Sequence, residues 1–422
     1  MPGHVARLGI GTTIAAMCLV AVSAQRLADP PTSVALYAGV GEELITFGVD
    51  VEHATLSRQS SVMLPGFVQE AWASPDGAFL YVAWSNGGSS YTGSGVEPRG
   101  DQHGITAFRV DARGALRQQG PPASLRSRPI HITGDGRGRY LLVAYNDPSG
   151  VSVHAINADG SVGAEVPQRA PLDAGIYAHQ VRVLPSNRAV VVVTRGNEPT
   201  ASSREDPGAL KVFRYDAGKL SDEISIAPQN GLGFRARHVD FHPTRPWVFL
   251  TIESQNRLQV FARMNDDMLS TQPLFSKSTL ANGGGVLPGQ SASTVHLHPN
   301  GQFVYVGNRN STALSAGGTN DIAVFRINQE TGEPSLIQNV DTRGVTPRTF
   351  SIDPAGRLLV VGNQTTLDVP EGTNVRTIPA NLAVFRIQKD GRLEFVRRYD
   401  VAVGRKPLWW VGLAGLPLAA SR

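Results

Sequence analysis

The sequence predicts an all-β protein, a single seven-bladed β-propeller closed by strands from both ends of the chain. Three observations lead to this fold class. A unit of three β-strands with a Pro- or Gly-containing turn recurs six times, at intervals of 51 to 59 residues. The strands are runs of Val, Phe, Leu and Tyr without helical periodicity, which is typical of strands buried on both faces. Two further apolar segments, one before and one after the repeats, supply a seventh unit.

Each repeated unit contains two strands joined by the turn, followed by a third strand. The first two strands lie, in chain order, within residues 72–86, 130–146, 179–197, 234–254, 294–310 and 348–364. The third strands lie at residues 104–110, 150–156, 209–215, 257–263, 321–327 and 381–387. A Gly-containing turn follows most third strands, as in NADGSV and QKDGRL, and leads into a short fourth strand. The interval is slightly longer than that of the usual four-stranded propeller blade.

The seventh blade is expected to combine the two ends of the chain. Residues 33–56 supply two strands and the turn into a third, and the apolar tail at 406–415 can pair with them. Closure by strands from both termini removes the open sheet edge that would invite aggregation. We therefore predict one propeller domain, residues 30–415, and no second domain.

The first 24 residues have the pattern of a secretory signal peptide. Arg7 precedes an apolar run at 8–22, and Val22-Ser23-Ala24 fits cleavage after Ala24. The run is short for a membrane span, and no later segment is long enough to be one. An uncleaved N-terminal anchor is the alternative. Because the only cysteine, Cys18, lies in this segment, the mature chain would have no disulfide and no thiol nucleophile. We expect export to a periplasm or beyond.

The composition and charge of the chain bear on one class of function, nucleic-acid binding. The chain is 41% hydrophobic and 18% charged, which is ordinary for a soluble globular protein. Its formal charge of +4 is small, and Lys and Arg are scattered without runs. A nucleic-acid surface needs a basic stripe. We therefore expect no nucleic-acid partner.

Polar residues gather at one rim of the expected ring. In a propeller blade the innermost strand starts at one rim of the central channel, and the second strand runs back to that rim. The start of the first strand and the end of the second therefore lie side by side. This rule collects His179, Arg195, Arg237, Glu253, Asn308, Arg309, Arg348 and Asn363. Taken alone, Arg237 and Glu253 would more often form a structural ion pair, His179 a backbone hydrogen bond, and Asn363 a cap or turn. Convergence from four blades on one mouth instead favours a ligand site.

Two other motifs are interpreted as structural. His296 and His298 stand two residues apart on one strand, as a pair of metal ligands could, but no third ligand is evident. The triple glycine at 283–285 neither follows a strand nor opens a helix, so it is a loop rather than a phosphate cradle. We expect neither a metal site nor a cofactor.

Several motifs carry a family resemblance over nearly the whole mature chain. They are AHQVRVLP at 178–185, RARHVDFHP at 235–243, FLTIES at 249–254, VYVGNRN at 304–310 and TPRTFSIDPAGRLLVVGNQ at 346–364. With these segments the chain resembles the seven-bladed lactonase family, which includes propeller-type 6-phosphogluconolactonase and fungal 3-carboxy-cis,cis-muconate cyclase. The resemblance implies an active-site set of His179, Arg237, Glu253 and Arg348, all of which the rim rule also selects.

The neighbours of this set depart from the family pattern. Ala236 replaces a proline, Thr194-Arg195-Gly196 replaces Asp-Leu-Gly, and Tyr145-Asn146 reverses the usual Asn-Tyr. The first repeat ends in Trp84-Ser85-Asn86, where a Glu is common, and a Gly/Ser-rich insertion follows at 86–104. The core set is retained while its surroundings differ, so the substrate is not specified by the motifs.

The resemblance implies a hydrolase that opens the ring of an anionic, sugar-acid type lactone. In that hypothesis Glu253 is the general base and His179 protonates the leaving alkoxide. Arg237 and Arg348 hold the anionic arm and the developing oxyanion, with Arg195, Arg309, Asn308 and Asn363 also binding substrate. No metal is required. The alternatives are a lactone-forming cyclase of the muconate type and a non-catalytic exported propeller that binds an anion or a partner protein. We expect a monomer with no membrane span after signal removal.

Overall fold

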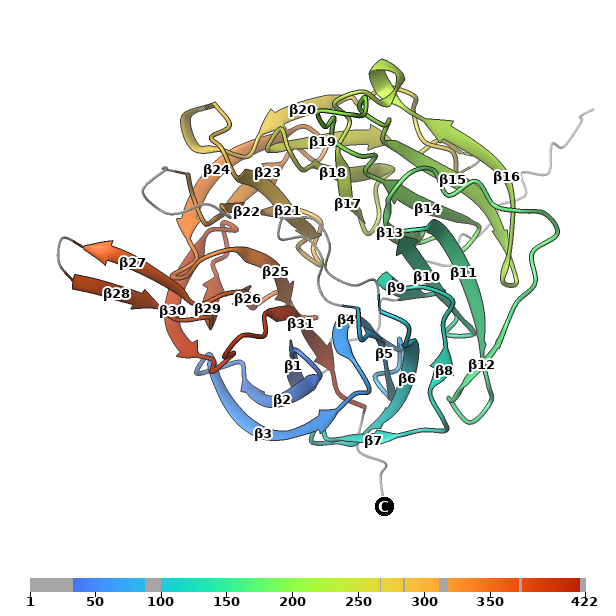
Figure 1. The fold of residues 1–422 in the computed structure, drawn as a ribbon. Helices are drawn as coiled ribbons and strands as arrows, with labels where there is room; N and C mark the ends of the chain where they lie inside the picture. Colours follow the sequence, from blue (N-terminus) through green and yellow to red (C-terminus); the bar gives the residue numbers. More distant parts are fainter. Residues whose placement is uncertain are drawn as a thin grey trace, which may run out of the picture. The chain divides into compact units, whose positions relative to one another are not determined.

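Seven β-sheets of four or five strands form a ring (Figure 1). Their innermost strands surround a central channel. The computed structural model describes residues 33–87, 100–265, 267–283, 285–310, 318–371 and 374–417. These residues belong to one compact unit, Pro31–Arg422. In this part of the chain the only helical segments are two short 3₁₀ turns, Pro228–Gly231 and Ala281–Gly283. No helix within the described ranges is both long and apolar enough to cross a membrane. The predicted all-β propeller is confirmed.

Six blades follow one another along the chain, each beginning with its innermost strand. Blade one contains β4 (Phe67–Ala73), β5 (Phe79–Ser85), β6 (His103–Val110), β7 (Leu116–Gln118) and β8 (Ala123–Ser124). Blade two contains β9 (Pro129–Gly134), β10 (Tyr140–Asn146), β11 (Ser149–Ile156) and β12 (Val162–Glu165). Blade three contains β13 (Ala178–Val183), β14 (Ala189–Thr194), β15 (Ala209–Asp216) and β16 (Lys219–Ile226).

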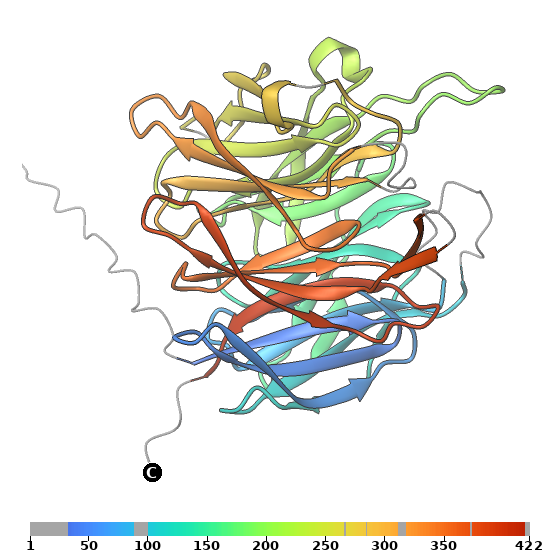
Figure 2. The ribbon, with the colours of Figure 1, turned by 90° about the vertical axis from the view of Figure 1, so that its left-hand side faces the viewer.

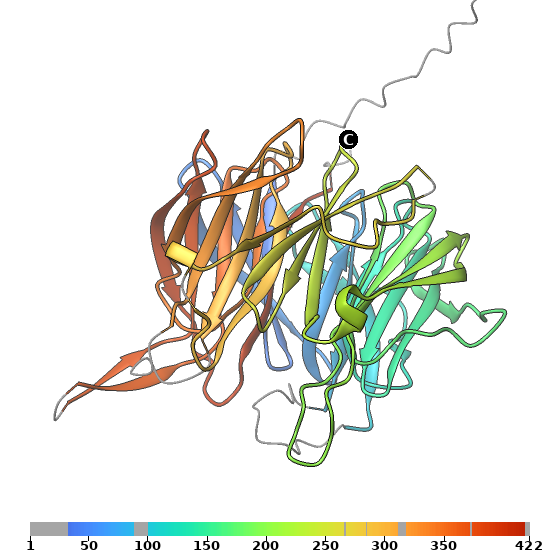
Figure 3. The ribbon, with the colours of Figure 1, turned by 90° about the horizontal axis from the view of Figure 1, so that it is seen from above.

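The next three blades have the same antiparallel order. Blade four contains β17 (Ala236–Phe241), β18 (Trp247–Ile252), β19 (Arg257–Ala262) and β20 (Phe275–Ser278). Blade five contains β21 (Gln290–Leu297), β22 (Phe303–Asn310), β23 (Asp321–Ile327) and β24 (Pro334–Asp341). Blade six contains β25 (Pro347–Ile352), β26 (Leu358–Asn363), β29 (Asn381–Ile387) and β30 (Leu393–Asp400). A separate hairpin, β27 (Leu367–Glu371) and β28 (Asn374–Ile378), projects from blade six (Figure 3).

Blade seven joins the two ends of the described chain, as predicted. The C-terminal strand β31 (Leu408–Gly415) is innermost, followed outward by β1 (Val34–Val40), β2 (Glu43–Asp50) and β3 (Thr55–Met63). One boundary was predicted too late: the innermost strand of blade one begins at Phe67 rather than near residue 72. Its first residues, Phe67-Val68-Gln69-Glu70, mix polar and apolar side chains, so they did not read as a buried strand.

The hydrophobic core is divided among the blade interfaces. Seven clusters of buried aliphatic and aromatic side chains each join two neighbouring blades. Both faces of a blade are therefore buried, which explains uninterrupted apolar runs such as Ala189–Thr194. Viewed from the side, the strands run between the two rims of the ring (Figure 2). The inner strand ends of every blade are thereby fixed around the channel.

Candidate active site

A register shift near the start of each innermost strand places residues at the channel mouth, the rim where these strands begin. In every blade this strand and its neighbour lose register there, as in a β-bulge. The shifts fall at Gln69, Ile130, His179, Arg237, Ser293, Arg348 and Trp409. Because a bulge re-aims a side chain, two consecutive residues can face the channel. Three residues of the implied active-site set occupy such positions.

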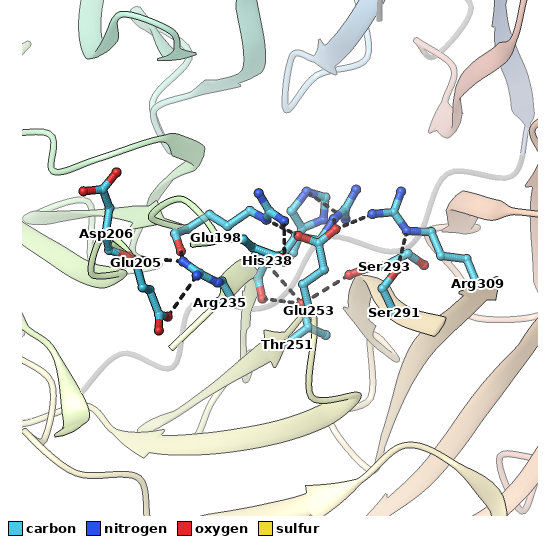
Figure 4. A network of polar contacts seen from close by, with 12 residues as sticks. Glu198, Glu205, Asp206, Arg235, His238, Thr251, Glu253, Ser291, Ser293 and Arg309 are labelled. Atoms are coloured by element: carbon cyan, nitrogen blue, oxygen red, sulfur yellow. Dashed lines mark hydrogen bonds and ion pairs between the residues drawn. The ribbon is translucent and has the colours of Figure 1, made fainter. Parts of the chain in front are cut away.

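Glu253 is the centre of a charged cluster at this mouth (Figure 4). Arg195 donates from Nε to Glu253 Oε2 at 2.5 Å, and Arg309 donates from Nη2 to Oε1. Arg237 Nε lies 3.4 Å from the same Oε1. Burial raises the pKa of Glu253, but the guanidinium groups of Arg195, Arg309 and Arg237 outweigh it and hold that pKa far below its usual range. Glu253 is therefore a firmly ionised anchor for three arginines.

Arg237 is wholly buried and only partly paired. Its Nε is near enough to Glu253 for an ion pair but not aligned for a hydrogen bond. Among the described residues, Nε and Nη2 have no hydrogen-bond partner, while Nη1 lies 3.5 Å from His238 Nε2. Burial, followed by repulsion from Arg309, lowers the pKa of Arg237 to about 9. The side chain stays cationic at neutral pH and retains donors for an anion.

Arg348 stacks on an aromatic ring, and the Glu70 carboxyl also acts on it electrostatically. Its guanidinium carbon lies 3.6 Å from the ring centroid of Trp409, a cation–π contact. No partner in the described chain accepts a hydrogen bond from Arg348 Nε or from Trp409 Nε1. Burial, together with repulsion from Arg237 and Arg309, lowers the pKa of Arg348. The indole face of Trp409 thus holds a fourth guanidinium group near the Glu253 cluster. Arg348 Nε remains available to a ligand.

His179 supplies a neutral imidazole next to these cations. Burial and the charge of Arg237 hold its pKa well below the ordinary value, so the ring is uncharged at neutral pH. Its Nδ1 lacks a hydrogen-bond partner within the part of the chain described. The ring lies 5.1 Å, centroid to centroid, from the ring of His238 and 6.5 Å from that of Tyr177. A neutral ring with an unpartnered nitrogen can take or give a proton.

Asn308 does not join this group, contrary to the prediction, and the amide nitrogen of Asn363 is held by other partners. The Asn308 amide donates to Thr279 O and Asp321 Oδ1, and its oxygen accepts from Asn256 and Thr279. Asn363 donates to Thr342 O and Asn381 Oδ1. Both side chains are wholly buried. Asn308 has no bonding capacity left for a substrate, whereas Asn363 Oδ1 has no hydrogen-bond partner among the described residues. They hold neighbouring strands and loops together instead.

Sequence reasoning missed several residues around the mouth. Trp409 and Tyr177 were not selected, although Tyr177 places its ring under Arg195 at 5.4 Å. Glu198 pairs with Arg195 at 3.2 Å, and Glu205 pairs with Arg235 at 2.9 Å (Figure 4). The adjacent Trp409-Trp410 at the start of a strand was the available signal. Two consecutive bulky residues there resemble the Arg237-His238 pair of blade four.

The histidine pair of blade five makes contacts with blades four and six. His298 contacts Gly356 O through Nε2 at 2.8 Å, and its Nδ1 accepts from Asn300 N at 3.1 Å. His296 packs against Phe350, and its Nδ1 lies 3.9 Å from Asp240. Within the described ranges, no group of three or more His, Cys, Asp or Glu side chains is arranged to hold a metal ion.

Comparisons with known proteins agree with the fold and with the motifs. The family model described as "Lactonase, 7-bladed beta-propeller" matches residues 32–370. A 6-phosphogluconolactonase of Pectobacterium atrosepticum is 28% identical over 366 residues, covering 85% of this chain and 92% of the relative. One from Bacillus subtilis is 24% identical over 336 residues, covering 78% and 86%. The solved periplasmic gluconolactonase of Pseudomonas aeruginosa is 20% identical, with a TM-score of 0.67 over 92% of this chain and 100% of that one.

Proposed function

The chain belongs to the lactonase family of seven-bladed β-propellers, and on that premise we propose that it hydrolyses an anionic, sugar-acid type lactone at the channel mouth. One observation carries the proposal. Guanidinium donors of Arg237 and Arg348 are buried and unpartnered in the described structure, next to the neutral imidazole of His179. Buried donors without partners are costly unless a ligand satisfies them.

The charge balance of the mouth favours an anionic substrate. Four guanidinium groups, those of Arg195, Arg237, Arg309 and Arg348, gather at the mouth. Two carboxylates oppose them, Glu253 and the Arg195 partner Glu198, which leaves two positive charges in excess. Taking such charges out of water is costly unless counter-charges accompany them. A carboxylate or phosphate on the substrate would provide them and could be held by two arginines at once. The relatives named 6-phosphogluconolactonase support a lactone of this kind.

We assign the proton transfer to His179. Its Nδ1 accepts a proton from the attacking water as the new C–O bond forms at the lactone carbonyl. Arg237 or Arg348 stabilises the negative charge that develops on the carbonyl oxygen. When the ring C–O bond breaks, the same imidazole returns the proton to the ring oxygen, giving a hydroxy acid. This scheme needs neither a metal nor another cofactor, because the guanidinium groups supply the positive charge.

Glu253 receives a different role from the general base expected from the sequence. With its pKa far below the usual range and both oxygens held by arginines, it is a poor base at neutral pH. We propose that it positions Arg195, Arg237 and Arg309. When the substrate anion draws on those guanidinium groups, the pKa of His179 would rise, since Arg237 is the main charge that lowers it.

The test is pH-stat hydrolysis of a lactone panel by the purified protein. The panel includes 6-phosphogluconolactone and the neutral glucono-δ-lactone, and the variants are Arg348→Met and His179→Asn. Losing a buried charged contact is expected to lower kcat/KM of Arg348→Met for the phosphorylated lactone by at least about thirtyfold. His179→Asn should lower kcat. Arg182→Met, at the other end of the channel, is the matched control. The proposal would be refuted if the parent hydrolysed no lactone of the panel. It would also be refuted if Arg348→Met and His179→Asn both turned over lactone as fast as the parent.

We also propose that the protein is exported, because residues 1–24 have the pattern of a signal peptide. A periplasmic or secreted enzyme would meet sugar-acid lactones outside the cytoplasm. N-terminal sequencing of the protein from its host should then begin at Gln25. Recovery of a chain that still begins at Met1 would contradict processing.

A further inference from the structure

A cavity of about 330 Å³ occupies the channel beyond the mouth cluster. We call it the channel cavity and define it by Glu70, His131, Gln180, His238, Thr294 and Thr349, which come from six different innermost strands. These residues follow the bulged positions, one step further from the mouth. The lining continues to Ala73 and Ala414, toward the opposite rim. The proposed hydrolysis uses none of the six residues that define the cavity.

The channel cavity is polar but carries little net charge at neutral pH. Burial raises the pKa of Glu70 to about 8, against the opposing effects of Arg348, Trp410 and Arg237. Burial lowers the pKa of His131 to about 3, and it also lowers the pKa values of His238 and His296. The remaining charge on the lining, Arg182, pairs with Asp240 at 3.0 Å. The cavity is therefore unsuited to the anion that the mouth would hold.

Its polar groups can both donate and accept hydrogen bonds. The Glu70 carboxyl accepts hydrogen bonds from the Trp410 side chain and the Ala71 backbone, and in its neutral form it still offers a donor. The Thr349 hydroxyl offers both a donor and an acceptor. His131 is nine-tenths buried, and its Nδ1 has no partner among the described residues. His238 Nδ1 and Thr294 Oγ1 lie 2.7 Å apart, which fixes the orientation of that ring. Orphaned buried groups of this kind are satisfied by a polar ligand or by water.

Aromatic surfaces complete the lining. Trp72 and Trp410 lie on neighbouring innermost strands, and Phe350 lies on the strand next to Trp410 on its other side. The C–H faces of a ring-shaped, hydroxylated molecule can pack against such surfaces while its hydroxyl groups reach the polar side chains. The volume is at the lower end of the range for small-molecule sites, about 300–1,000 Å³.

We propose that the channel cavity is a second binding site, separate from the mouth, for an uncharged polyhydroxylated molecule of monosaccharide or cyclitol size. Glu70, Thr349 and His131 supply hydrogen bonds to its hydroxyl groups, and Trp410 and Trp72 supply apolar walls. The site does not depend on the proposed hydrolysis, since its ligand need not be a lactone.

Ligand-observed NMR with myo-inositol and D-glucose tests the proposal, because neither compound can be hydrolysed. Saturable binding to the parent at pH 7 is expected, with a Kd of about 1 mM. Thr349→Val and Glu70→Leu should each weaken binding by at least about threefold, because each removes hydrogen-bonding groups without enlarging the cavity greatly. Glu70→Gln keeps a donor and an acceptor and should stay within about threefold of the parent.

The matched control is Arg309→Met, which removes a charge from the mouth and should leave binding unchanged. Thermal unfolding of each variant shows whether the propeller has folded. If Glu70→Leu does not fold, Thr349→Val alone tests the proposal. Absence of saturable binding of both compounds up to about 100 mM would overturn the proposal. So would binding that Arg309→Met abolishes and Thr349→Val leaves intact. Because the readout is binding alone, failure of lactone hydrolysis leaves this result unaffected.

Discussion

Glu253 shows how one residue determines the electrostatics of the mouth. It is buried, yet it stays ionised because Arg195, Arg237 and Arg309 surround it. The arginines in turn are tolerated inside the protein because this carboxylate offsets part of their charge. Removing the carboxylate would leave guanidinium groups that repel one another without compensation. The residue is thus expected to be important for stability as well as for binding.

Glu253→Gln should lower the free energy of unfolding at pH 7 by about 3–5 kcal/mol, the usual cost of removing one partner from a buried ion cluster. Folding lowers the pKa of this carboxyl from 4.5. The unfolded chain therefore binds more protons below that pH, and the stabilisation is present above pH 4.5 and lost as the pH falls toward the folded value. Urea unfolding of parent and variant at pH 7, 5 and 3 measures the difference. The difference in unfolding free energy between parent and variant should be smaller at pH 3 than at pH 7. A difference that does not change with pH would contradict the lowered pKa of Glu253 in the folded protein.

At the scale of the strand, the alternation of side chains separates two kinds of polar residue. In blade five, Asn308 and Arg309 are consecutive, but only Arg309 reaches Glu253. Asn308 points into the blade, where it joins Thr279, Asn256 and Asp321. Alternation of side chains along a strand explains the difference, since neighbouring residues face opposite sides.

This difference predicts opposite effects for two adjacent substitutions. Asn308→Ala leaves several buried polar groups unpaired and should cost about 2 kcal/mol or more of stability, with KM for an anionic lactone nearly unchanged. Arg309→Met should raise KM by about tenfold or more and change stability less. Denaturant unfolding and steady-state kinetics on both variants measure the two effects. A larger KM change in Asn308→Ala would place its side chain at the mouth after all.

At the scale of the whole molecule, ring closure links folding to the site. The C-terminal strand β31 pairs with β1 and is innermost in its blade, so it seals the sheet and also supplies Trp409 and Trp410 to the channel. Without it, β1 would present an unpaired edge, which invites aggregation. The last strand of the chain is therefore as important for the ligand sites as for stability.

A chain truncated after Arg405 should be aggregated or largely unfolded, because blade seven would lose its innermost strand. A chain truncated after Pro417 keeps β31 and is the matched control, which should remain soluble and cooperative in thermal unfolding. Size-exclusion chromatography and circular dichroism distinguish the two. A soluble Arg405 truncation with the melting temperature of the parent would show that closure is dispensable.

The sequence by itself determined the repeat, the seven blades and the closure by both termini, because buried strands and their turns follow local periodicity. It also selected His179, Arg195, Arg237, Glu253, Arg309 and Arg348, since strand ends at one rim must meet. Only the tertiary structure decided which side each polar residue faces, because a register shift of one residue reverses that choice. It placed the Asn308 side chain inside its blade and revealed Trp409 beside Arg348. It alone also gave Glu253 its strongly lowered pKa and Glu70 its raised one, since both depend on burial and on charges contributed by other blades.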